Sequence, residues 1–269
     1  MPLPPPRARR LLSFALAGGL GSRAVGELLS PSGSLLIAHN WTLAAAAALL
    51  VPTLVRNAGW FGPVVTRFPT LRREVWLTID DGPDPVETPA ILDVLARHGA
   101  QATFFTIGEK VDRWPDLARA VVAAGHRVEN HTFRHRAASY WAALPPHAGR
   151  EIERGSAAIA RAVGTAPTSF RAPAGLANPF VHAACERAGL RMIGWSASGN
   201  DGIAHDPERV VAKILRAVRP GAIILLHEGP LKGLAPGTRA RTLEAVLLGL
   251  AAQGYRTVIP TLPNDDRQG

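Results

Sequence analysis

Short apolar runs alternate with segments of helical periodicity from Glu74 to the end of the chain. Strand-like runs occupy 75–79, 102–107, 127–129, 168–171, 190–195, 222–226 and 255–259. Several of the segments between them begin with a proline that follows a capping residue, which is typical of helix starts. These predicted helices are Pro89–Arg97 capped by Thr88, Pro115–Ala124 after Trp114, Pro179–Ala188 capped by Asn178, and Pro207–Val218 capped by Asp206. Because strand and helix alternate, the pattern predicts a parallel sheet.

The number of units narrows the fold class. About seven strand–helix units follow one another, and no G-x-G-x-x-G sequence comes after the first strand, as it would in a dinucleotide-binding sheet. A chain of 269 residues is long enough for one barrel-type domain or for two smaller domains. We therefore predict an α/β fold in which the sheet is closed, or nearly closed, into a (β/α) barrel.

The first 72 residues have a different character. Residues 1–10 are rich in Pro and Arg, and 35–55 form an Ala-rich apolar stretch long enough to cross a bilayer, although His39 and Asn40 interrupt it. A buried soluble helix is the alternative, because Ala contributes little transfer energy and Pro52 would kink the last turn. We favour a membrane helix over 35–55, within an N-terminal segment 1–72 that precedes a catalytic barrel over 73–262 and a polar tail over 263–269.

Charge and cysteine content exclude some classes of function. Lys and Arg total 30 against 21 Asp and Glu, giving a net charge of +9, which favours an acidic surface or polymer as a neighbour. No basic run is interleaved with aromatic residues and only 2 tyrosines are present, so we expect no nucleic-acid partner. The single cysteine, Cys185, excludes an intrachain disulfide and is expected to pack in the core.

Polar side chains gather where the predicted strands end. In a parallel barrel all carboxyl ends of the strands open on one face, where active sites are built. Each such residue alone has an ordinary explanation as a helix cap or solvated group, but their joint position predicts one site. Two adjacent carboxylates and two imidazoles four residues apart are also a ligand set for a catalytic metal with a spare acid beside it. The residues are Asp80 and Asp81, His131 and His135, Arg171, Trp195, Asp201 and His227.

Four segments resemble the signature motifs of the polysaccharide deacetylases, carbohydrate esterase family 4, which share a chitooligosaccharide deacetylase (NodB) homology domain. They read T-I-D-D-G, N-H-T-F-R-H, F-R-A-P-A-G and I-I-L-L-H, in the family's order, within about 73–262. The resemblance implies a distorted (β/α) barrel with seven or eight strands. It also implies hydrolysis of N-acetyl groups in chitin or peptidoglycan, or of O-acetyl groups in xylan, with a divalent metal. Zn²⁺ is expected, with Co²⁺, Ni²⁺ and Fe²⁺ as alternatives.

The same resemblance implies a role for each matching residue. Asp80 corresponds to the catalytic base, and Asp81, His131 and His135 to the metal ligands. Arg171 would hold the base, a backbone N–H near Ala174 would bind the oxyanion, and His227 paired with Asp201 would be the general acid. Pro173, Ala174 and Trp195 would line the substrate site.

The chain departs from the family pattern at two motifs. Ala174 stands where the family commonly has Tyr, and of the common Asp-x-x-Asp-Trp motif only Asp201 remains. Loss of aromatic walls leaves catalysis intact but puts the substrate in doubt, because a polymer is gripped less firmly.

Three functions therefore remain open at this point. The first is an N-deacetylase of an envelope glycan, either peptidoglycan or a chitin-like oligosaccharide. The second is a deacylase or deformylase of a lipid-linked amino sugar. The third is a non-catalytic, membrane-tethered glycan-binding protein, against which the presence of Asp80 and His227 argues. An iron oxygenase also uses two His and one carboxylate but has a different fold and ranks last. We expect the protein at the inner membrane, with its barrel facing the envelope.

Overall fold

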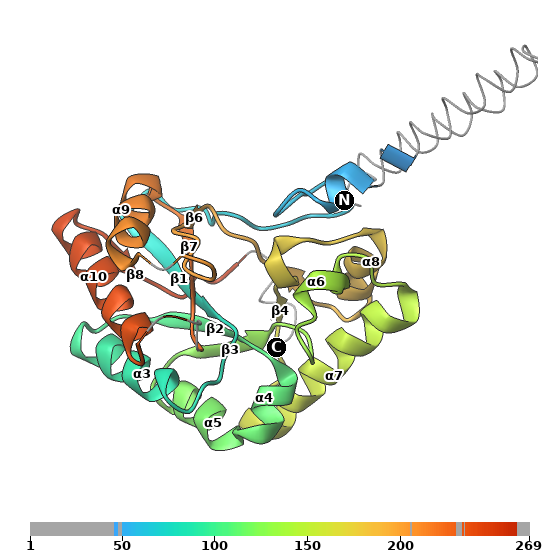
Figure 1. The fold of residues 1–269 in the computed structure, drawn as a ribbon, viewed down its shortest axis with the longest axis horizontal. Coiled ribbons are helices and arrows are strands. Elements are labelled where there is room, and N and C mark those ends of the chain that lie inside the picture. Colours follow the sequence, from blue (N-terminus) through green and yellow to red (C-terminus); the bar gives the residue numbers. More distant parts are fainter. Residues whose placement is uncertain (1–45, 48–49, 205, 230–232, 234, 263–269) are drawn as a thin grey trace, which may run out of the picture.

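The computed structural model describes residues 46–47, 50–204, 206–229, 233 and 235–262 (Figure 1). Its centre is an eight-stranded sheet in the order β5-β4-β3-β2-β1-β7-β6, with β8 paired to β1. Every pairing between these strands is parallel. The strands are β1 Glu74–Asp80, β2 Ala102–Thr106, β3 Arg127–Asn130, β4 Ser169–Phe170, β5 Arg191–Met192, β6 Ala197–Ser198, β7 Ala222–His227 and β8 Arg256–Thr257.

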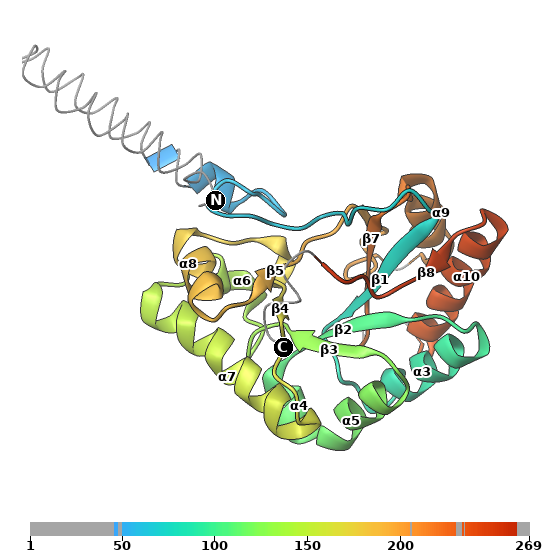
Figure 2. The ribbon, with the colours of Figure 1, turned by 180° about the vertical axis from the view of Figure 1, so that it is seen from behind.

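The sheet is a half-barrel with one open seam. Within the described residues β5 and β6 do not pair, although only 193–196 separate them in the chain. The helices lie around the outside of the sheet (Figures 1 and 2). They are α3 Glu87–Arg97, α4 Gly108–Arg113, α5 Pro115–Ala123, α6 Ala137–Tyr140, α7 Pro145–Val163, α8 Pro179–Arg187, α9 Pro207–Ala217 and α10 Thr238–Ala252, with a 3₁₀ turn η1 at Pro173–Gly175. The predicted parallel, distorted barrel is thus confirmed, with incomplete closure.

Side-chain caps begin two of the helices, α8 and α9. The Asn178 carboxamide oxygen accepts from the backbone N–H groups of Phe180 and Val181, both at 2.9 Å, and Asp206 accepts from Arg209 N–H at 3.1 Å. The predicted cap at Thr88 is wrong. Thr88 lies inside α3, and Asp84 accepts from the first N–H groups of that helix instead.

Several elements differ from the sequence pattern. Helices α4, α6, α7 and α10 and strand β6 were not predicted. The run 190–195 yields only the two residues of β5, so Trp195 lies beyond its strand. Helix α7 is 19 residues long but carries small residues on its buried side, including Gly155. A Cβ at Gly155 would lie 2.7 Å from Asn130 Oδ1, so glycine allows α7 to pack directly beneath the loop that follows β3. Apolar residues on the same side, Ile152 and Ile159 among them, are also buried, so close packing and apolar burial together hold this helix.

Side-chain alternation on the central strands sets which residues face the barrel interior. On β1, Leu77 and Ile79 belong to the core between sheet and helices, whereas Trp76 belongs to the opposite cluster inside the barrel. Successive strand residues point to opposite faces, so Asp80 shares the interior face with Trp76. Strand β7 repeats the pattern, with Ile224 outside and His227 inside. Because side chains alternate along each strand, the polar last residues of β1 and β7, Asp80 and His227, both face the barrel interior.

The N-terminal segment is described only in part. Residues 50–53 are helical, and Leu50, Val51, Leu54 and Val55 are each between 51% and 59% exposed. Most of the predicted membrane helix 35–55, and the tail 263–269, lie outside the described residues. Among the described residues, no helix has both the length and the apolar character needed to cross a bilayer.

Candidate metal and catalytic site

Strand register brings the predicted acid and base side by side. Asp80, the last residue of β1, is the pairing partner of His227, the last residue of β7. On the other side, Asn130 of β3 pairs with Phe170 of β4, so His131 and Arg171 leave neighbouring strands at the same level. Residues that are far apart in the sequence are thus gathered at one end of the sheet.

Asp81, His131 and His135 form a cluster at this end. Their ligand-type atoms all lie within 4.8 Å of one another. Asp81 Oδ1 is 3.2 Å from His135 Nε2 and 3.5 Å from His131 Nε2. The same Asp81 oxygen is buried and has no hydrogen-bond partner. A buried carboxylate oxygen without a partner is costly unless a cation binds there.

The protonation of His131 also suits a cation. Its Nδ1 lies 2.7 Å from the backbone oxygen of Arg171. Because a carbonyl only accepts, Nδ1 carries the hydrogen, and Nε2 presents its lone pair toward Asp81. Burial, followed by the nearby His135, holds the pKa of His131 well below its usual range, so the ring is neutral. Two imidazoles and one carboxylate fit Zn²⁺ or a related divalent ion and leave further coordination positions open.

Residues on the two loops that carry Asp81 and the two histidines are held in an uncommon backbone conformation. Asp81, Thr132 and His135 all have positive φ, at 77°, 67° and 49°. Asn130, which the sequence reasoning overlooked, fixes the turn by accepting from Thr132 N–H at 2.7 Å and donating to Ile152 of α7 at 2.8 Å. Strain of this kind persists only where surrounding structure imposes it, and it is typical of functional sites.

Asp80 is buried and paired with a fully buried arginine. Arg171 Nη1 donates to Asp80 Oδ1 at 2.6 Å and to Thr78 Oγ1 at 2.8 Å. Asp80 Oδ2 is left 3.7 Å from His131 Nε2, at the edge of the metal-ligand cluster. Burial raises the pKa of Asp80 above its usual range, and the guanidinium of Arg171 opposes that rise. One oxygen of Asp80 is thereby anchored while the other faces the cluster.

His227 has its own carboxylate partner. Its Nδ1 lies 2.9 Å from Asp201 Oδ1, and its backbone N–H donates to Asp201 Oδ2 at 2.7 Å. Burial disfavours the charged ring, but the charge and hydrogen bond of Asp201 outweigh it and raise the pKa of His227 to about 9. Arg239, which had no sequence signal, donates to the backbone oxygen of Asp201 at 2.6 Å and keeps this acid in place.

The third-motif residues lie on a turn beside the cluster. Pro173 is buried and Ala174 is exposed, and Ala174 has φ 55° within η1. Trp195 packs against this turn, because a Cβ on Gly175 would lie 2.6 Å from its ring. The Trp195 ring also lies 5.7 Å from the Arg171 guanidinium carbon. The turn, Trp195 and the Asp80–Arg171 pair therefore form one contiguous region.

Two further residues near Asp81 escaped the sequence reasoning. Lys110 Nζ donates to the backbone oxygen of Asp81 at 2.6 Å. The backbone N–H of Glu228 donates to the backbone oxygen of Asp80 at 2.9 Å, and its buried carboxyl accepts from the Thr88 hydroxyl. Burial raises the pKa of Glu228 to about 8. Its position next to His227 was a usable signal, whereas nothing in the sequence marked Lys110.

Known proteins are similar to this chain in sequence and in structure. The family model for polysaccharide deacetylase matches residues 68–193. A chitooligosaccharide deacetylase of Bradyrhizobium sp. (strain ANU 289) is 39% identical over 191 residues, covering 71% of this chain and 84% of that protein. A peptidoglycan-N-acetylglucosamine deacetylase of Bacillus cereus is 34% identical over 199 residues, covering 73% and 91%. A solved family 4 carbohydrate esterase from Streptomyces lividans, in complex with acetate, is 29% identical with a TM-score of 0.63, covering 70% and 93%.

The geometry of the cluster predicts distinct metal affinities for its two aspartates. Asp81→Asn should weaken Zn²⁺ binding by at least about 100-fold, because it removes a charged ligand, whereas Asp80→Asn should change it less than about tenfold. Competition with a chromophoric chelator measures both affinities. Equal affinities in the two variants would rule out this division of the aspartates.

Proposed function

The chain belongs to the polysaccharide deacetylase family, and we propose that it is a metal-dependent hydrolase that removes the N-acetyl group from N-acetylglucosamine-type units of an envelope glycan. The observation that carries the proposal is the placement of the Asp81–His131–His135 cluster beside a buried Asp80–Arg171 pair. A cation site with a spare, anchored carboxylate matches what amide hydrolysis by water requires.

Asp81, His131 and His135 would hold the ion, for which Zn²⁺ is the first choice and Co²⁺, Ni²⁺ or Fe²⁺ are alternatives. When bound, such an ion supplies Lewis acidity, which acidifies water and polarises a carbonyl. The neutral state of His131 and the unpaired Asp81 oxygen prepare the chain for that ligand.

Asp80 is assigned as the general base. Its Oδ1 is held by Arg171, so Oδ2 is the oxygen that takes a proton from the attacking water. Arg171 fixes the direction of the carboxylate and stabilises its charged form against burial. The backbone N–H of Ala174, on the η1 turn, is assigned to the oxyanion that forms at the acetyl carbon.

His227 is assigned as the general acid. Asp201 keeps the ring protonated at neutral pH, with Nδ1 engaged, so that Nε2 is the atom that donates to the leaving sugar amine. The pairing of Asp80 on β1 with His227 on β7 supports this assignment. Acid and base therefore reach the scissile bond from adjacent strands.

The substrate is proposed from the surroundings of the site. Ala174 is exposed and offers no aromatic wall, so a long polymer would be held mainly by groups other than stacked rings. This favours short or membrane-proximal glycans and keeps the deacylation or deformylation of a lipid-linked amino sugar as the second candidate. A non-catalytic glycan-binding role is disfavoured, because Asp80 and His227 both retain their partners.

We also propose attachment to the inner membrane through 35–55, with the barrel on the envelope side. The apolar side chains Leu50, Val51, Leu54 and Val55 are exposed without a covering layer in the described residues. Only a few residues later, Asn57 N–H donates to Gly175 O at 2.8 Å. Val55 and Asn57 are two residues apart, which spans at most about 7 Å, so the end of the proposed helix lies near the turn that carries Gly175.

The first test is the release of the acyl group. With Zn²⁺, the protein should release acetate from N-acetylglucosamine oligomers or peptidoglycan, measured by an enzymatic acetate assay. Formate released from a lipid-linked N-formyl amino sugar, without acetate from either glycan, would favour the second candidate instead. Asp80→Asn should lower kcat by about 100- to 10,000-fold with normal metal content. Substantial activity in that metal-loaded variant would remove Asp80 as the base.

The second test uses pH. The active, protonated form of His227 is lost as pH rises through its pKa of about 9, which sets the alkaline limit of activity. Asp201→Asn removes the charge that raises this pKa, while the burial that lowers it remains. The alkaline limb of kcat/KM should therefore move to lower pH by about one unit or more, with the acid limb unchanged. If the alkaline limb did not move, His227 could not be the general acid.

The third test addresses the membrane. The full chain should remain in the pellet after carbonate extraction of cell membranes, and a variant that begins after Val55 should appear in the supernatant. Recovery of the full chain in the supernatant would exclude an integral anchor. The shortened variant keeps Asn57 and all the proposed site residues, so its acetate release serves as the control for folding.

A further inference from the structure

We propose that Asn57 is a positioning residue for the catalytic site, and that it acts at one end of residues 57–66, here called the strap. Asn57 precedes the region 68–193 that the family model matches. The inference rests on the proposed function for the roles of Ala174 and Arg171. Its physical basis is a set of contacts that join the strap to the two segments holding those residues.

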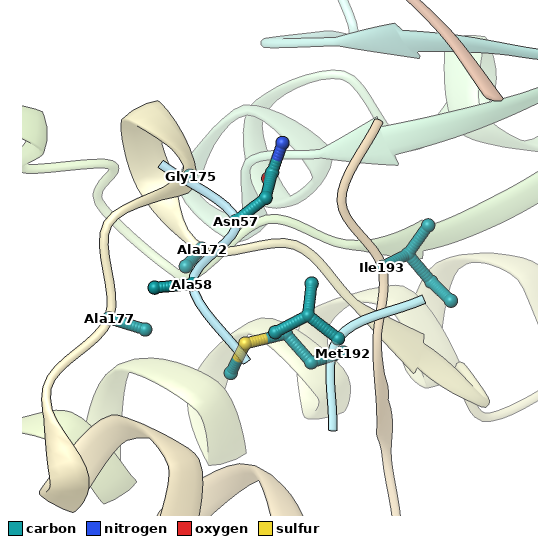
Figure 3. A pocket seen from close by; sticks show the side chains of 8 residues that line it. Asn57, Ala58, Ala172, Gly175, Ala177, Met192 and Ile193 are labelled. Carbon is teal, nitrogen blue, oxygen red and sulfur yellow. The ribbon is translucent and has the colours of Figure 1, made fainter. Parts of the chain in front are cut away.

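Asn57 bonds to both of these segments at once. Its backbone N–H donates to Gly175 O at 2.8 Å, and its side-chain Nδ2 donates to Trp195 O at 3.1 Å. Gly175 closes the turn that presents Ala174, and Trp195 lies on the stretch between β5 and β6. Figure 3 shows Asn57 between this turn and the stretch that carries Ile193. One residue therefore links the two loops that follow the paired strands β4 and β5.

The fit around Asn57 is close. A Cβ on Gly175 would lie 3.0 Å from Asn57 Oδ1, and a Cβ on Gly194 would lie 2.6 Å from the same atom. Both loops thus use glycine where they meet this side chain. Asn57 itself has φ 57°, in the left-handed region that asparagine tolerates better than most residues. Residue type and backbone conformation together suit Asn57 to this position.

The other end of the strap reaches the partners of Arg171. Val65 N–H donates to Met192 O at 2.9 Å, and Gly194 N–H donates to Val65 O at 2.8 Å. In the same stretch, the backbone oxygens of Ile193 and Gly194 accept from Arg171 at 3.2 and 3.0 Å. The acceptors that orient Arg171, and through it Asp80, therefore lie on a segment that the strap holds.

The hollow between the strap and the barrel is too small to be a ligand site. It measures about 210 Å³, including space open to solvent. Ligand pockets typically enclose about 300 Å³ or more. The walls are mostly small or apolar, and they come from the strap, the third-motif turn and β5 (Figure 3): Asn57, Ala58, Val64, Ala172, Gly175, Ala177, Met192 and Ile193.

The test compares Asn57→Gly with Val64→Ala in the full-length, Zn²⁺-loaded protein. Asn57→Gly keeps the left-handed backbone and the N–H group but deletes the side chain that binds Trp195. Val64→Ala removes apolar contact from the hollow beside the strap without removing a hydrogen bond. We expect Asn57→Gly to lower kcat by about 10- to 100-fold, with KM within about twofold and unchanged Zn²⁺ affinity, because misplacement of catalytic groups affects the transition state most. Val64→Ala should keep its kcat within about twofold.

A kcat for Asn57→Gly equal to that of Val64→Ala would overturn the proposal, while acetate release by the wild type would leave the proposed function standing. Hydrogen exchange measured by mass spectrometry tests the strap independently of activity. In Asn57→Gly, amides in 173–177 and 192–196 should exchange faster, and those in 127–135 should not. Unchanged exchange in the first two regions would equally overturn the proposal, whether or not any substrate is turned over.

Discussion

The buried ion pair between Asp80 and Arg171 is the interaction on which the site depends. Arg171 is fully buried, and its guanidinium donates to Asp80, to the Thr78 hydroxyl and to two backbone oxygens of the stretch after β5. The Phe105 ring lies 4.1 Å from its central carbon. Loss of one partner from such a pair leaves an unpaired buried charge, which typically costs about 3–5 kcal/mol. Arg171 therefore connects β1, β4 and the stretch after β5, and it fixes the direction of the Asp80 carboxylate.

Adjacent carboxylates acquire different chemistry because their partners differ. Asp80 has one oxygen fixed by Arg171, whereas Asp81 Oδ1 is buried, lacks a partner and faces two imidazoles. A third carboxylate, Asp201, is directed by Arg239 toward His227 and keeps that ring charged. Different partners thus give the three acids different environments. This difference supports the proposed division into base, metal ligand and orienting acid.

The predicted elements and the observed elements differ where long-range packing decides. The strands that end at Asp80 and His227 were predictable, because an apolar run of strand length precedes each of these residues. Helix α7 was not, because its buried side includes Gly155, whose value lies in allowing close approach to the loop after β3. Trp195 was placed at a strand end, but β5 stops at Met192, where pairing with β4 ends. The strap was overlooked because its contacts are almost entirely with residues more than a hundred positions away.

The sequence by itself determined the parallel strand–helix order, the family, and which acids and imidazoles lie at strand ends, because period-two alternation and local motifs are short-range properties. Only the tertiary structure decided which of those groups meet. Strand register brings Asp80 beside His227, and burial keeps His131 neutral. The contacts of Arg239 with Asp201 and of Asn57 with Trp195 have no counterpart in any local sequence pattern. Hydrogen bonds and desolvation depend on neighbours in space, and the folded chain alone supplies those neighbours.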